Sequence, residues 1–112
     1  MTDDKPKAPR HLKAATRRWW AAVVNDWTLE AHHIRLLTLA AEAWDRGQEA
    51  RALVAKDGLC VATKAGGPRL HPAVRVQQEA EIGFARLIRE LDLDVAPPAE
   101  AKRPPSLRSI AR

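Results

Sequence analysis

The chain has 112 residues and a mass of 12.4 kDa, which is the size of one small domain. This length excludes a barrel enzyme, a two-lobed kinase and a complete dinucleotide-binding fold. Lysine and arginine number 19 against 14 aspartates and glutamates, so the net charge is +5. A basic chain of this kind favours a polyanionic partner, either nucleic acid or an anionic membrane, over a charge that serves solubility alone.

Hydrophobic residues make up 46% of the chain, but many of them are alanine, so large aliphatic side chains are few. One copy is therefore expected to have a thin core and to borrow core from other copies. Cys60 is the sole cysteine, which excludes a disulfide within the chain and fits a reducing compartment. The start of the chain is polar and contains Pro6 and Pro9, unlike a signal peptide, and no apolar run approaches the roughly 20 residues of a spanning helix. We therefore expect a soluble, cytoplasmic protein.

The first half of the chain predicts an arm and two helices. Residues 1–11 are polar and basic and show no apolar period, which predicts a flexible arm. Apolar residues then recur at steps of three and four and predict helices over 12–27 and 29–57. Thr28 is the expected cap at the start of the long helix, and Gly58 is expected to end it. The apolar arc of the long helix is wider than one surface helix needs, so we expect it to contact a neighbouring helix and another copy.

A short β-hairpin is predicted after the long helix. Residues 59–63 and 68–71 are typical of strands, and the segment between them has turn chemistry. Cys60 is expected to pack inside this hairpin rather than to act as a nucleophile. A lone two-stranded hairpin is marginal in water, so we expect it to lie on the helices or on a neighbouring copy.

Pro72 suits the first position of a third helix, which is predicted to run to about residue 93. Gly83 and Ala85 would allow a packing partner to approach this helix closely. Residues 95–112 are basic and rich in proline, which predicts a disordered tail. The fold class is thus mainly α, with one oligomerisation and DNA-recognition domain over residues 12–94.

Positive charge gathers at the two ends of the chain, since residues 1–18 hold six basic and two acidic groups and residues 95–112 hold four and one. A membrane-binding helix would carry basic residues along one face, and the long helix does not. The start of the first helix also offers backbone N–H groups to phosphate. The alternative is a solvated arm without a ligand. The candidate DNA contacts are Lys5, Lys7, Arg10, Lys13, Arg17 and Arg18.

The sequence offers no catalytic constellation, no phosphate-binding loop and no cofactor motif, so we expect a chain that is not an enzyme by itself. His32 and His33 are adjacent and point about 100° apart on a helix, which prevents them from acting as a ligand pair. Cys60 and His71 would supply two ligands across the hairpin, whereas a structural zinc site needs four. We therefore expect no metal.

The four tryptophans favour a structural role over base stacking, because a chain with few large aliphatic residues needs them as core or interface anchors. The residues expected in the core or at an interface between copies are Trp20, Trp27, Ile34, Leu37, Trp44, Val61, Leu70 and Phe84.

The order of several short motifs resembles a known family. Residues 8–12 (APRHL), 19–20 (WW), 29–33 (LEAHH) and 36–45 (LLTLAAEAWD) are followed by GGPR, HPA and RLIREL in the second half. This order is similar to the small subunit of a tailed-phage terminase, in the short helical family of siphophages and prophages, and the resemblance covers roughly residues 8–94.

The chain departs from the family pattern at two positions. Thr16 stands where the family commonly has a glycine, and Asp92 stands where the family tends to end its last helix with glycine. Aspartate tolerates left-handed backbone better than most residues, so a helix can still end there.

The resemblance implies a ring-forming subunit that recognises the packaging site of double-stranded viral DNA in the host cytoplasm. It also implies a homo-oligomer of about eight to ten copies, a large terminase subunit that carries the ATPase and nuclease, and, in some phages, an HNH endonuclease as a further partner. The tail residues expected to contact DNA or the large subunit are Lys102, Arg103, Arg108 and Arg112.

Two other function classes stay open from the sequence. A small transcription regulator would need a helix-turn-helix, for which residues 26–29 could form the turn. The long helix that follows is apolar and net acidic, which does not suit a recognition helix. A protein-interaction adaptor would use the basic ends for solubility alone.

Overall fold

The computed structural model describes residues 5–93 and 96–99, and its regular elements are mainly helical. They are α1 (Ala14–Asp26), α2 (Ala31–Asp57), β1 (Cys60–Ala62), β2 (Pro68–Leu70) and α3 (Pro72–Leu91). The strands pair antiparallel, with Val61 opposite Arg69. The predicted fold class, three helices with a short hairpin before the last one, is confirmed. Helices α1 and α2 each begin two residues later than predicted, and α3 ends two residues earlier.

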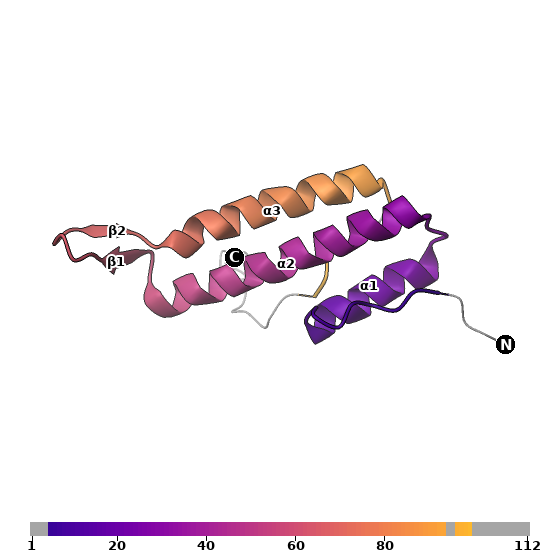
Figure 1. The fold of residues 1–112 in the computed structure, drawn as a ribbon, viewed down its shortest axis with the longest axis horizontal. Coiled ribbons are helices and arrows are strands. Elements are labelled where there is room, and N and C mark those ends of the chain that lie inside the picture. Colours follow the sequence, from indigo (N-terminus) through magenta and orange to yellow (C-terminus); the bar gives the residue numbers. More distant parts are fainter. Residues whose placement is uncertain (1–4, 94–95, 100–112) are drawn as a thin grey trace, which may run out of the picture.

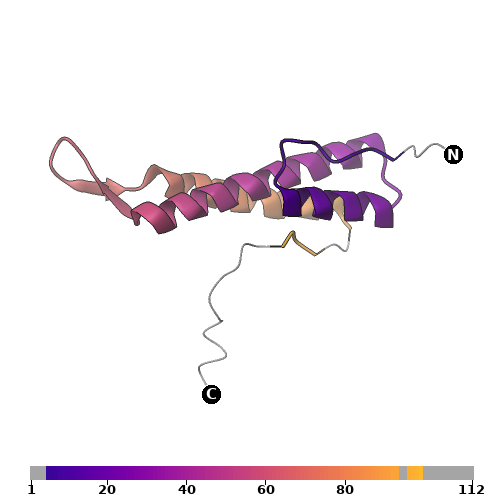
Figure 2. The same cartoon turned by 90° about the horizontal axis from the view of Figure 1, so that it is seen from below.

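The elements form an elongated protomer with two distinct ends. Helices α2 and α3 run antiparallel beside each other, and α1 lies antiparallel to the first half of α2 (Figure 1). Beyond α1, the remaining halves of α2 and α3 continue as a two-helix arm that carries the hairpin at its end (Figure 2). We call the three-helix end the base, and we call residues 52–78, which include the hairpin, the tip.

The ends of the helices follow from individual residues. Gly58 ends α2 at φ 87°, where a side chain would be strained. Asp92 ends α3 in the left-handed conformation at φ 54°, so the departure from the family glycine is accommodated as expected. The expected cap at Thr28 is wrong: α2 begins after Glu30, whose backbone N–H donates to His33 Nδ1 at 3.1 Å. An imidazole three residues into the helix thus satisfies a donor that a threonine side chain was expected to serve.

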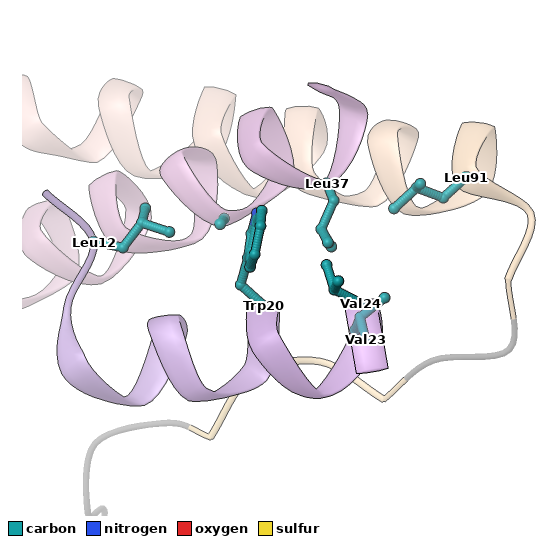
Figure 3. Packing of buried hydrophobic residues seen from close by; sticks show 7 residues of the cluster. Leu12, Trp20, Val23, Val24, Leu37 and Leu91 are labelled. Atoms are coloured by element: carbon teal, nitrogen blue, oxygen red, sulfur yellow. The ribbon is translucent and has the colours of Figure 1, made fainter. Parts of the chain in front are cut away.

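The hydrophobic core lies in the base, between α1 and the first half of α2 (Figure 3). Trp20 is 1% exposed, and its Nε1–H donates to Thr38 Oγ1 at 3.1 Å, so its polar atom is satisfied. Leu37 packs against α1 and Leu91 closes the cluster from the end of α3. Because α2 is covered by α1 and by α3 of its own chain, its wide apolar arc does not require a second copy there.

The two-helix arm is held together by small residues. A Cβ on Gly47 would lie 3.3 Å from the Ala80 Cβ, so the missing side chain lets α2 and α3 approach closely. Ala50 and Ala73 are the other buried apolar residues of the arm. A Cβ on Gly83 would meet nothing within 4 Å among the described residues, so the close approach of a packing partner at Gly83 stays a prediction for a partner outside the chain.

Candidate nucleic-acid interface

The basic segment before α1 does not extend away from the body but runs back along α1 (Figure 2). Lys5 Nζ donates to Asn25 Oδ1 at 2.9 Å and to the Asn25 carbonyl at 3.3 Å, which places it at the far end of α1. Lys7 is exposed between this end and the turn that leads into the helix. Residues 5–11, which the sequence assigned to a flexible arm, thus lie beside α1 and bring positive charge along its length.

Arg17 holds the turn that precedes α1. Its Nη1 donates to the Leu12 carbonyl at 2.6 Å and to the Arg10 carbonyl at 3.3 Å, and the side chain is partly buried. These bonds fix the entry of the chain into the helix. Arg17 therefore contributes positive charge to this surface while its guanidinium is already engaged in the structure of the turn.

A carboxylate of the same chain, that of Asp45 on α2, lies at the N-terminus of α1. The Asp45 carboxylate accepts from the Lys13 backbone N–H at 2.8 Å and from Thr16 Oγ1 at 2.6 Å. Negative charge at the start of a helix stabilises it through the helix dipole and its free N–H groups. The expectation that this helix start leaves its N–H groups free for phosphate is therefore wrong at Lys13, because α2 supplies the anion.

Five of the six candidate residues are exposed around α1: Lys5, which is bonded to Asn25, and Lys7, Arg10, Lys13 and Arg18. The turn that displays Arg10 is fixed to α2 at a second point, since His11 Nε2 and Glu42 Oε2 lie 2.8 Å apart. The start of α1 and the turn before it therefore present exposed cations on a backbone that hydrogen bonds position. Sequence reasoning found the cations but missed Asp45, Thr16 and Glu42, because the partners come from residues about 30 positions apart.

The residues expected in the core or at an interface fall into two groups. Trp20 and Leu37 are buried in the base, and Trp44 and Phe84 are partly buried with ring centroids 5.0 Å apart. The others are partly or largely exposed in one protomer: Trp27, Ile34, Val61 and Leu70. Of these four, Ile34 packs against the core cluster, whereas the exposed Trp27 and Leu70 are consistent with a contact outside the chain.

Cys60 and His71, which the sequence placed across the hairpin from each other, lie in different surroundings. Cys60 is exposed and lies opposite Leu70, so its expected burial in hairpin packing is wrong. His71 uses both ring nitrogens, since Nδ1 accepts from the Ala73 N–H at 3.0 Å and Nε2 lies 2.9 Å from Asp57 Oδ2. Within residues 5–93 and 96–99, no group of three or more His, Cys, Asp or Glu side chains could hold a metal ion.

The tail contacts predicted at Lys102, Arg103, Arg108 and Arg112 lie outside the described residues. In the part of the chain that the structure describes, no helix is long and apolar enough to cross a membrane.

Helix α1 lies antiparallel beside α2 (Figure 1) rather than crossing it steeply, which disfavours the helix-turn-helix of a transcription regulator.

Comparison with known proteins decides the family. A family model described as phage terminase, small subunit, matches residues 13–105, which is most of the chain. The chain belongs to the phage terminase small subunit family. Neither the curated proteins nor the solved structures contain a match to it. The small terminase subunit is generally the non-catalytic one, and membership implies partners in the packaging motor such as DNA and the large subunit.

Proposed function

We propose that this terminase small subunit assembles into a closed ring, binds the packaging site of double-stranded viral DNA in the host cytoplasm, and recruits or regulates the large subunit to start packaging. The observation that carries this proposal is the family match over residues 13–105. Two features of the structure also support it: the exposed cations around α1 and the exposed apolar residues of α2 and α3.

Ring assembly is supported by where the large apolar side chains lie. Leu39, Leu53 and Ile82 are about half exposed on α2 and α3, at 50%, 48% and 54%. Burial of these side chains against other copies would supply apolar contacts that a single copy lacks. A closed ring of about eight to ten identical subunits would use one such contact repeatedly.

DNA binding is assigned to the surface around the start of α1, through Lys7, Arg10, Lys13 and Arg18. Such side chains bind phosphates and supply affinity without reading sequence. A ring multiplies weak contacts, and multivalent binding can exceed single-site affinity by about 10²–10⁴. The tail would contact DNA or the large subunit, and an HNH endonuclease is a further partner in this scheme.

The first test is the mass of the purified protein by native mass spectrometry at moderate salt, with and without duplex DNA. A closed assembly of about eight to ten copies is the expected result. A monomer or dimer under both conditions would contradict the ring. It would favour a small transcription regulator or a protein-interaction adaptor instead.

The DNA assignment is tested by a quadruple variant, K7Q/R10Q/K13Q/R18Q, which spares Arg17 because that side chain holds the turn. We expect weaker binding and a flatter salt dependence, by about 0.9 in slope for each phosphate contact removed. The matched control, R35Q/R46Q/R86Q/R89Q, removes the same charge from exposed positions on α2 and α3. Equal affinities and slopes for the two variants would contradict the assignment.

A further inference from the structure

The tip carries a second concentration of positive charge, at the opposite end of the protomer from α1. Residues 52–78 contain four basic side chains, Lys56, Lys64, Arg69 and Arg75, and one acidic residue, Asp57. All four basic side chains are exposed, and none makes an ion pair among the residues that the structure describes. The Asp57 carboxylate lies against His71, 2.9 Å from Nε2. The tip is therefore a cationic surface that residues 5–93 and 96–99 do not neutralise.

The hairpin projects this charge away from the helices (Figures 1 and 2). Its residues are exposed apart from Val61 and Thr63, which are partly buried, so the ribbon rests on neither α2 nor α3 along its length. The sequence predicted that such a hairpin would lie on the helices or on a neighbouring copy, because two strands alone are marginal in water. Since the helices of its own chain do not cover it, the hairpin is accessible to a partner outside the chain.

The turn of the hairpin is narrow and internally fixed. Thr63 Oγ1 donates to the Gly67 carbonyl at 2.7 Å, and the Gly66 N–H donates to the Thr63 carbonyl at 3.1 Å. Gly66 has φ 102°, and a Cβ on it or on Gly67 would meet open space, so the backbone is uncovered at these two positions of the turn. The major groove of duplex DNA is about 12 Å wide and admits a two-stranded β-ribbon.

We propose that the tip is a second contact surface for duplex DNA, separate from the surface around α1, in which Lys64 and Arg69 bind backbone phosphates and the hairpin lies against a groove. The proposal extends the proposed DNA-binding function to a site at the other end of the protomer. DNA fits this charge pattern better than an acidic protein, because a continuous polyanion can meet both positive ends of one elongated subunit at once.

The test compares full-length variants for binding to a fluorescent duplex of about 30 base pairs and arbitrary sequence, by anisotropy between about 50 and 200 mM salt. The K64Q/R69Q variant removes the two cations of the hairpin. Its control, R35Q/R86Q, removes two exposed cations from α2 and α3. We expect K64Q/R69Q to lower the salt slope by about 1.8 and to weaken binding more than about tenfold at 100 mM salt, with the control unchanged.

A third variant, R10Q/K13Q, separates failure of this proposal from failure of the proposed function. If the wild type binds, R10Q/K13Q weakens binding, and K64Q/R69Q matches its control, the tip proposal is overturned while the α1 surface stands. If the wild type shows no salt-dependent binding, both are overturned. A native mass of K64Q/R69Q that differs from the wild type also overturns the proposal, since the hairpin would then serve assembly.

Discussion

Replacing Asp45 with asparagine should move stability and DNA binding in opposite directions. The Asp45 carboxylate accepts from the Lys13 N–H at 2.8 Å and from Thr16 Oγ1 at 2.6 Å, and Thr16 is 2% exposed. Asparagine keeps one carbonyl oxygen as an acceptor, replaces the second oxygen with an NH₂ donor and carries no charge, so D45N loses the charge-assisted part of both bonds. A hydrogen bond to a charged group contributes about 1.5–3 kcal/mol, and charge at a helix N-terminus adds about 0.3–1 kcal/mol.

We therefore expect D45N to lose about 2–3 kcal/mol of unfolding free energy. For a domain of this size that loss corresponds to a fall in Tm of about 10–20 °C, measured by circular dichroism at one fixed protein concentration. The control is E49Q, which removes a negative charge from an exposed position one turn further along α2. An unchanged Tm for D45N would refute the argument that Asp45 caps α1.

DNA binding by folded D45N should become tighter. Asp45 places a negative charge at the same helix start at which we assign phosphate contacts. At about 10 Å in water, repulsion between that charge and one phosphate costs about 0.4 kcal/mol, a factor of about two. Over two phosphates the gain is about fourfold at low salt, measured by anisotropy well below the lowered Tm. Unchanged or weaker binding would refute the placement of DNA at the start of α1.

Three further substitutions test the packing. G47V should destabilise the protein by about 1–3 kcal/mol in chemical denaturation, because the first added carbon already lies 3.3 Å from the Ala80 Cβ; stability equal to wild type would mean that the helices are not in close contact there. W20A should cost about 3–5 kcal/mol, because Trp20 is 1% exposed at the centre of the base; a loss below about 1 kcal/mol would contradict the core. H71A removes the acceptor for the Ala73 N–H and the contact to Asp57, so hydrogen exchange at the start of α3 should accelerate while that of α1 does not.

The fold could be predicted from local signals because each boundary depends on residues close in sequence. Gly58 and Pro72 mark the end of α2 and the start of α3 by their own backbone preferences. The prediction that α3 can end at Asp92 was also correct, because tolerance of the left-handed backbone conformation is a property of that residue alone. The prediction of Thr28 as the cap of α2 was wrong because the sequence offers two ways to cap this helix within three residues. In the structure, His33 accepts from the backbone N–H of Glu30, and the helix begins after Glu30.

The candidate site could be predicted only in part, because its chemistry depends on contacts between elements. The sequence identifies which residues are cationic, but it does not reveal that Asp45 reaches the start of α1 or that Arg17 is engaged by two carbonyls. The same limit applies to Cys60, whose apolar neighbours in sequence predict burial although its side chain is exposed in the described part of the chain. The periodicity of a sequence identifies the apolar face of a helix, whereas the element that packs against this face depends on the tertiary structure.

The base and the two-helix arm differ in how much stability apolar burial gives them. The base contains Trp20 and several large aliphatic residues, whereas the arm packs alanine against glycine and leaves Leu53, Val76 and Ile82 between 39% and 54% exposed. Full burial of such a side chain contributes about 1.5–3 kcal/mol, so burying the remaining halves of these three would add about 3 kcal/mol for each protomer. That amount is a large fraction of the 5–15 kcal/mol by which a typical domain is stable. The base can therefore be stable within one chain, while the stability of the arm, and the position of the tip that it carries, would depend on assembly.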